Sequence, residues 1–161
     1  MEKYIKKEGC PFCSEEVADI TFLESTNFRV IYNHAPILPG HSLVIPKSHI
    51  ESLLDLNESE LFEFTQLSIK AAKLLLRAFK ADSFNWTLQE KAPAGQTISH
   101  LHIHIFPRHE NDLPNPGDWY PLLLSSEENK HIDSELRQKL SLDELHKIVR
   151  HLIDEANYLF N

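Results

Sequence analysis

The stretch QTISHLHIHIFPR, residues 96–108, decides the predicted fold because three histidines occupy every second position within it. Successive side chains of a β-strand point to opposite faces, so His100, His102 and His104 would share one face of a strand over residues 100–107. The aliphatic residues between them would face the other way and anchor the strand to the core. The pattern therefore predicts a buried strand that presents imidazole groups on one side.

Two segments before the histidine strand alternate apolar and polar residues, a third is a short β-branched run that Pro46 ends, and a fourth is rich in aromatic residues. They predict strands at residues 19–25, 27–33, 41–46 and 83–90. Beyond the histidine strand, residues 108–131 are rich in proline and predict an irregular excursion.

Two helices are predicted from apolar residues that recur at helical spacing. The first covers residues 57–80, with Asn57 and Glu60 at the spacing of a capping box, and the second begins near Ser141, with Glu144 three residues later. Short strands, hairpin-length links and one long helix between the third and fourth strands predict an α+β fold with an antiparallel sheet.

Length and charge restrict the class of protein. The 161 residues are enough for one domain with its own core. The net charge of -8 argues against a protein that coats nucleic acid, although a few donors in a cleft can still hold a small phosphorylated ligand. No apolar run approaches a membrane span, and the first ten residues lack the apolar region of a secretory signal, so a cytoplasmic location is expected.

The only two cysteines, Cys10 and Cys13, form a C-x-x-C motif. In a reducing compartment this spacing is typical of half a metal site or of a redox pair. A thioredoxin-type role would need a βαβ setting, which the pattern of elements does not suggest, while unmetallated thiols remain an alternative.

Imidazole groups on a rigid strand suit nucleophilic chemistry near neutral pH. The unperturbed pKa of histidine is about 6.5, so a neutral ring can attack phosphorus while a neighbouring ring donates to the phosphoryl oxygens. Same-face positions lie about 6.5–7 Å apart, too far for one tetrahedral metal to take all three without distortion. A surface histidine strand and a purely structural metal strand are the alternatives.

The heptad HLHIHIF resembles the H-φ-H-φ-H-φ-φ signature of the histidine triad, or HIT, superfamily of nucleotide hydrolases and transferases. AGQT, NHAPILPGHSLVIPKSHI and PRHEND resemble further segments of that family, in the family's order, over roughly residues 10–112. The segment LQEKAPAGQTISHLHIHIFPR is most similar to the Fhit-like branch, which cleaves diadenosine polyphosphates.

This resemblance implies a five-stranded antiparallel sheet with one long helix and a C-terminal helix, in a single domain over residues 1–161. The core would cover about 10–112, followed by an extension and helix over 113–161. The family generally forms homodimers that join two sheets into a ten-stranded one. A small-molecule nucleotide is the implied partner, with no nucleic acid and no membrane, and a divalent cation such as Mg²⁺ could accompany it.

The resemblance also implies a role for each matching residue. His102 would be the nucleophile that takes the α-phosphate as a covalent nucleotidyl-histidine, and His104 would contact the phosphoryl oxygens and assist the leaving group. His41 would support the site without a catalytic step. Substrate contacts are implied for Asn33, Gln89, Gly95, Gln96, Thr97, Ile98 and His104. Without the family, Asn33 could equally be a turn former, and Gln96 a solvated loop residue.

Many bacterial HIT proteins bind structural zinc through an N-terminal knuckle that resembles CPFC here. By similarity, the four ligands would be Cys10, Cys13, His49 and His100. His100 would then serve the metal and not the nucleotide.

One segment departs from the family. Fhit-like chains commonly carry a glycine in the loop before AGQT, where this chain has Lys91 and Ala92, which leaves the substrate open. A nucleoside phosphoramidase, a phosphorylase and a nucleotide-binding protein without catalysis are the alternative functions. Trp119 and Tyr120, outside the resemblance, are expected to pack, with contact to a nucleobase as the alternative.

Overall fold

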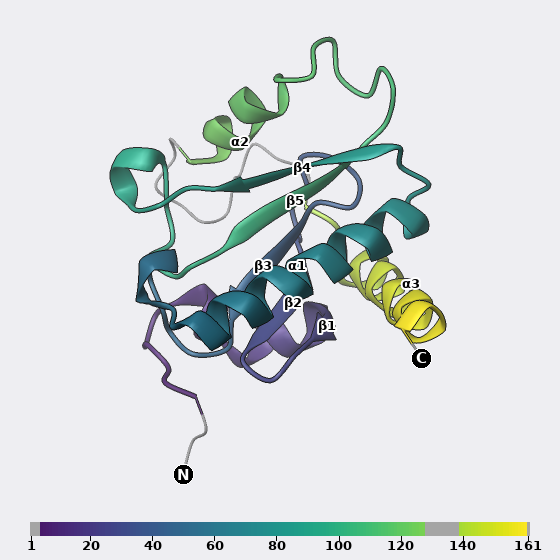
Figure 1. Cartoon of the computed structure of the whole chain (residues 1–161). Coiled ribbons are helices and arrows are strands. Elements are labelled where there is room, and N and C mark those ends of the chain that lie inside the picture. The colour runs from purple at the N-terminus through teal and green to yellow at the C-terminus, as the bar shows by residue number, and fades with distance from the viewer. Residues whose placement is uncertain (1–3, 128–138, 161) are drawn as a thin grey trace.

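A five-stranded antiparallel sheet forms the centre of the molecule, with strand order β1-β2-β3-β5-β4 (Figure 1). The structure is a computed structural model and describes residues 4–127 and 139–160. The α+β prediction and the five strands are confirmed. The strands are β1 (Thr21–Glu24), β2 (Phe28–Tyr32), β3 (Ser42–Pro46), β4 (Ser83–Leu88) and β5 (Ile103–Arg108).

Two long helices, α1 (Glu58–Ala78) and α3 (Leu142–Phe160), cover one face of the sheet and contact each other. Both predicted capping boxes are present. The side chain of Asn57 accepts from the amide of Glu60, and the amide of Asn57 donates to the carboxylate of Glu60; Ser141 and Glu144 make the same pair of bonds. Each box satisfies amide groups that would otherwise have no partner at a helix start. The core lies between these helices and the sheet, and includes Phe28, Phe64, Leu74, Leu101, Ile103, Ile105 and Leu152.

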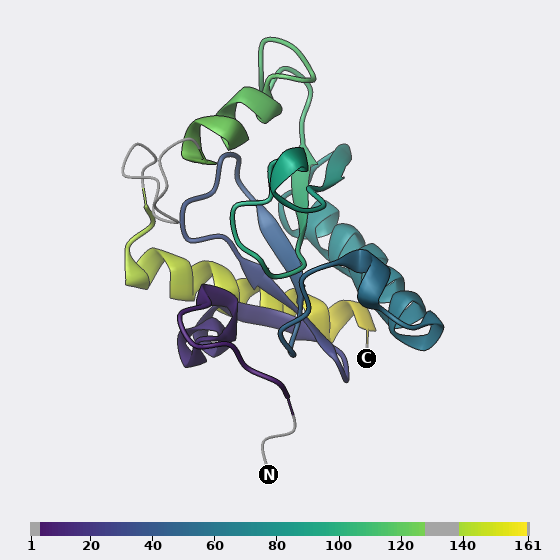
Figure 2. The same ribbon diagram turned by 90° about the vertical axis from the view of Figure 1, so that its left-hand side faces the viewer.

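The opposite face carries two smaller apolar clusters with the histidines between them. One cluster joins Val17 and Phe12 to β2 and β3, through the 3₁₀ helices η1 (Pro11–Cys13) and η2 (Glu15–Ile20). The other joins Phe106 of β5 to Trp119 and Leu123 of α2 (Trp119–Glu127). In Figure 2 the loop between β4 and β5 faces the viewer, with α2 above it and the N-terminal segment below.

Three details differ from the sequence predictions. Residues 108–131 were expected to be irregular, but α2 occupies part of them, because Leu123 and Trp119 have Phe106 to pack against. Residues 128–131 of this segment lie outside the described residues. The histidine strand begins at residue 103 and not at 100. The short helices η3 (Leu53–Asp55) and η4 (Ala92–Ala94) were not expected. Within the described ranges, no helix has the length and apolar character that a bilayer crossing requires.

An ion pair fixes the loop that leaves β5. Arg108, 8% exposed, makes two hydrogen bonds of 2.8 Å to the carboxylate of Asp112 and also binds Asn85 and the carbonyl of Pro116. The guanidinium group lowers the pKa of Asp112 from 3.8 to about 2. Two parallel charge-assisted hydrogen bonds are stronger than neutral ones, so this pair anchors the return of the chain toward α2.

Replacing Asp112 with asparagine is expected to lower the free energy of unfolding by about 1.5–3 kcal/mol at pH 7, because charged hydrogen bonds are lost. The folded-state pKa lies below the unfolded one, so this stabilisation is complete above pH 4 and is lost as the pH falls through about 2. Urea unfolding between pH 7 and pH 2.5 measures the difference, with the exposed Asp19→Asn as control. If the difference in the free energy of unfolding between the parent protein and Asp112→Asn does not decrease as the pH falls, the stabilising role of this ion pair is wrong.

Candidate active site and metal centre

His104 lies on the face of the sheet opposite helices α1 and α3. On β5 it pairs with Leu43 of β3 and Thr87 of β4, while its neighbours Ile103 and Ile105 point into the core. This is the alternation expected from the sequence. The ring of His104 is 6% exposed and stacks on Phe106 at 5.8 Å.

His102 precedes the strand, and a backbone carbonyl fixes its ring. Its Nδ1 lies 2.7 Å from the carbonyl oxygen of His100, which can only accept, so Nδ1 carries the hydrogen. A neutral ring then has its lone pair on Nε2, which has no hydrogen-bond partner among the residues that the structure describes. Burial lowers the pKa of His102, so the neutral form dominates at pH 7. The ring is 4% exposed and presents a nitrogen nucleophile.

A hydrogen-bond relay fixes the tautomer of His104. Nδ1 of His41 lies 3.3 Å from two donors, the backbone amide of Ile37 and the side-chain amide of Asn33, so it accepts. The hydrogen of His41 is therefore on Nε2, which lies 2.9 Å from Nδ1 of His104 and donates to it. This leaves the hydrogen of His104 on its own Nε2. The two rings thus carry complementary roles: His102 offers a lone pair and His104 offers a donor.

Asn33 is fixed within this relay. Its side-chain oxygen accepts from the amide of Ala35 at 2.9 Å, which forms the turn that the sequence offered as an alternative. The orientation of its amide follows, with the nitrogen toward His41. His41 is fully buried and lies 4.5 Å from the ring of Phe106, in keeping with a supporting position.

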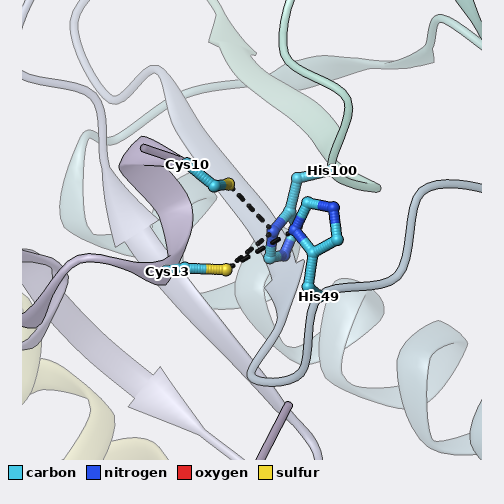
Figure 3. Close-up of side chains that lie close together, drawn as sticks. All are labelled: Cys10, Cys13, His49 and His100. Carbon is cyan, nitrogen blue, oxygen red and sulfur yellow. Dashed lines mark hydrogen bonds between the residues drawn. The ribbon is translucent and has the colours of Figure 1, made fainter. Parts of the chain in front are cut away.

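The four predicted metal ligands come together in one cluster (Figure 3). Cys10 and Cys13 project from η1, and two loops bring His49 and His100 toward them, so that all four ligand atoms lie within 4.8 Å of one another. Nδ1 of His100 is 3.5 and 3.7 Å from the two sulfurs, and Nδ1 of His49 is 3.5 Å from Cys13. For tetrahedral zinc, ligand bond lengths imply a sulfur–nitrogen separation of about 3.6 Å.

The second ring nitrogen, Nε2, of each of these two histidines also has a polar partner. Nε2 of His100 donates to the carbonyl of Pro46 at 3.0 Å, and Nε2 of His49 lies 3.2 Å from the carboxylate of Glu51. Both lone pairs therefore face the sulfurs, as metal-binding histidines require. Burial lowers the pKa of His100 to about 4 and raises the pKa of Cys10, so burial favours the neutral form of these two groups. Two soft thiols and two imidazoles fit zinc.

The metal cluster and the histidine face adjoin through His100 and Phe12. The side chain of His100 faces the cysteines while its carbonyl accepts from His102. The ring of Phe12, between the two cysteines, stands edge-on to both His100 and His102, at 5.5 and 5.3 Å. The predicted metal ligand His100 is thus linked to His102 directly by a hydrogen bond and also through the ring of Phe12.

The loop between β4 and β5 holds the remaining predicted contacts. Gln96 uses its side chain within the loop: its oxygen accepts from the amide of Lys91, and its nitrogen donates to the carbonyls of Glu51 and His100. Gly95 has a φ of 96° and closes η4 with a hydrogen bond to Ala92. Thr97 is exposed and Ile98 half-buried.

Gln89 lies at the end of β4, on the same side as His104. It is 5% exposed, its nitrogen donates to Thr87 at 3.0 Å, and its buried oxygen has no partner among the described residues. A buried acceptor without a partner is costly, so a donor on a ligand would stabilise it. Thr87, like Phe12 and Glu51, was not singled out from the sequence. Its position two residues before Gln89 on one face of the strand was the available signal.

Comparison with known proteins agrees with this geometry. Residues 14–111 match the HIT domain family. The chain is 36% identical over 148 residues to a bis(5'-nucleosyl)-tetraphosphatase (asymmetrical) of Schizosaccharomyces pombe, covering 83% of this chain and 81% of the relative. It is 32% identical over 103 residues to a bis(5'-adenosyl)-triphosphatase of Dictyostelium discoideum, covering 64% and 68%.

A solved structure has the same fold. It is that of a hypothetical histidine triad nucleotide-binding protein from Sulfolobus tokodaii, with a TM-score of 0.72, 26% identity and coverage of 93% of both chains.

Proposed function

This chain belongs to the HIT domain family, and on that premise we propose that it hydrolyses dinucleoside polyphosphates through a covalent nucleotidyl-histidine at His102. The observation that carries the proposal is the 2.7 Å hydrogen bond from Nδ1 of His102 to a carbonyl, which leaves a lone pair on Nε2. The activities of the fission yeast and Dictyostelium relatives support the substrate class. A histidine whose ring nitrogens are assigned in this way is ready to attack phosphorus.

The reaction has two displacements at one phosphorus atom. Nε2 of His102 attacks the α-phosphorus, a P–N bond forms, and the P–O bond to the rest of the phosphate chain breaks. The leaving nucleotide departs with the electron pair of that bond. Water then attacks the same phosphorus and loses a proton to solvent, the P–N bond breaks, and nucleoside monophosphate leaves. His102 regains its lone pair.

His104 would stabilise the charge that develops on the phosphoryl oxygens. The relay from Ile37 and Asn33 through His41 supports a hydrogen on Nε2 of His104, which is the donor that this step needs. His41 would act as a positioning residue, since it touches His104 and not the substrate. A ribose contact by Asn33 remains part of the proposal.

Phosphate and substrate contacts are proposed for the β4–β5 loop. The buried, unsatisfied oxygen of Gln89 supports a contact to a ligand donor. The backbone amides of Thr97 and Ile98 would donate to phosphate oxygens, while Gly95, whose amide donates to Ala92, would shape the loop around them. Gln96 would act chiefly by holding the carbonyl of His100.

We propose zinc as the ion of the Cys10, Cys13, His49 and His100 cluster, supported by the donor set and the ligand separations. When bound, zinc would supply structural cross-linking and no reactive water, because four protein ligands complete its coordination. Within residues 4–127 and 139–160, no other group of histidine, cysteine or carboxylate side chains is arranged to hold a metal. A Mg²⁺ ion would therefore enter with the nucleotide.

A homodimer is proposed through the β4 edge of the sheet. Phe84 and Trp86 of this edge strand are 40% and 38% exposed, and Phe62 and Ile69 of the adjoining helix α1 are 65% and 45% exposed. An edge strand beside exposed apolar side chains favours association.

Sedimentation is expected to give twice the chain mass of 18.6 kDa, and Trp86→Lys to give the monomer. The exposed Leu142→Lys is the control, and a monomeric parent protein contradicts the proposal.

We also propose a single domain over residues 1–161 and a cytoplasmic location. The free state of both cysteines supports the location, because thiolate ligands persist where thiols are kept reduced.

A kinetic panel tests the function. Diadenosine triphosphate and tetraphosphate are expected to give the highest kcat/KM, with nucleoside monophosphate as one product. An adenosine phosphoramidate should react more slowly. A preference of several orders of magnitude for the P–N substrate would instead indicate a phosphoramidase, and products that require added phosphate would indicate a phosphorylase.

A further inference from the structure

Lys91, the first residue of the loop after Gln89 and Glu90, has a strained backbone. Its φ of 65° and ψ of 170° lie in a region that almost only glycine adopts, because a Cβ atom crowds the backbone there. The side chain is exposed and makes no ion pair or hydrogen bond with the described residues. A lysine at such a position is unfavourable for stability, which suggests that its side chain has a role.

The surrounding loop fixes this conformation. The amide of Lys91 donates to the side chain of Gln96 at 3.0 Å, and its carbonyl accepts from the amides of Ala94 and Gln96 at 3.0 and 3.1 Å. The side-chain nitrogen of Gln96 also donates to the carbonyl of His100, which is the acceptor for His102. The strained residue is therefore linked to the carbonyl that orients the nucleophile.

The charges around Lys91 favour an anionic ligand. Two residues earlier, the buried oxygen of Gln89 has no partner among the described residues, and as an acceptor it would take a donor such as a ribose hydroxyl group and not a phosphate oxygen. Within residues 89–98, Lys91 is the only cationic side chain of a protein with a net charge of -8. Of the nearby carboxylates, Glu51 pairs with Lys7, and Glu90 accepts from the amide of Leu53 through one oxygen while its other oxygen is buried without a partner among the described residues. A phosphate chain that reaches this loop, which faces the viewer in Figure 2, would therefore meet the exposed side chain of Lys91.

We propose that Lys91 is a specificity-determining residue whose ammonium group binds the distal phosphates of the leaving nucleotide and so favours longer phosphate chains. This inference rests on the proposed function. A tetraphosphate substrate releases a more anionic group than a triphosphate, so a fixed cation stabilises its departure more. Lysine binds phosphate as a flexible point charge, which suits chains of variable length.

Lys91→Gly tests the inference, with Lys80→Gly as a matched control. Lys80 is also an exposed lysine with positive φ, 52°, but follows helix α1. Both variants are expected to raise Tm by about 2–4 °C, because glycine relieves the strain. Only Lys91→Gly should lower kcat/KM for diadenosine tetraphosphate, about tenfold, and for the triphosphate about threefold or less. Added salt should reduce the difference in kcat/KM for diadenosine tetraphosphate between the parent protein and Lys91→Gly.

Equilibrium binding separates this inference from the proposed function. In a His102→Ala background, Lys91→Gly should weaken the binding of inorganic tripolyphosphate, measured by calorimetry, about tenfold, and Lys80→Gly should not. An unchanged chain-length preference together with unchanged tripolyphosphate affinity overturns the role of Lys91. A parent protein that turns over no dinucleoside polyphosphate overturns the proposed function, while the affinity measurement still decides for or against Lys91.

Discussion

Replacing His102 with alanine is expected to lower kcat for diadenosine polyphosphates by at least about 10⁴-fold, because the nucleophile itself is removed. His102 is 4% exposed, and its Nδ1 hydrogen is held by a carbonyl, so Nε2 is the nitrogen that would attack. Substrate binding should be retained. Steady-state kinetics and calorimetric titration with a slowly cleaved analogue measure the two effects separately.

The same experiment has a direct chemical readout. Rapid quench of the parent protein with substrate should add the mass of one nucleoside monophosphate to the peptide that contains His102. His104→Ala should still form the adduct but about 10²–10³-fold more slowly, as expected when one donor to the phosphoryl oxygens is lost. His151→Ala, an exposed position on α3, serves as control. Turnover that survives in His102→Ala would falsify the nucleophile assignment.

Removing the proposed zinc ion is expected to lower the thermal stability more than any other change considered for this protein. Structural zinc in small domains contributes about 10 kcal/mol or more, and here the hydrophobic core already holds part of the chain. A loss of about half that energy would lower Tm by roughly 10–20 °C for a domain of this size. The double variant Cys10→Ser, Cys13→Ser and chelator-treated parent should show the same decrease in a thermal melt.

The control is the double cysteine variant treated with chelator. A chelator should leave the Tm of the double cysteine variant unchanged, because its cluster can no longer hold the ion. Elemental analysis should give one zinc per chain for the parent and none for the variant. If the untreated parent protein, as purified, contains no zinc and melts at the same temperature as the double variant, Cys10 and Cys13 are ordinary thiols and the zinc proposal is wrong.

The geometry also connects these two predictions. His100 contributes its side chain to the metal cluster and its carbonyl to His102, and Phe12 touches both rings. Metal loss should therefore reduce kcat as well as stability, though by less than removal of His102. The reason is that His102 would lose part of its orientation but would still have the lone pair on Nε2.

Much of the fold could be predicted because its signals are local. The alternation of histidines with aliphatic residues assigns their faces, and the capping boxes at Asn57 and Ser141 fix the helix starts, since each depends on residues two to four positions apart. Helix α2 could not be predicted in the same way. It forms because Trp119 and Leu123 find Phe106, which is a contact outside the local sequence.

The sequence by itself determined the antiparallel α+β architecture and the family of the chain, with the four candidate metal ligands suggested by the resemblance. Tertiary structure alone decided which nitrogen of His104 carries the hydrogen, since its donor His41 belongs to a segment that is 63 residues away in the sequence. It also brought Cys10 to His100 across 90 residues, and gave Lys91 its glycine-like backbone. Periodicity encodes which face a side chain takes, whereas its hydrogen-bond partners depend on how distant segments close on one another.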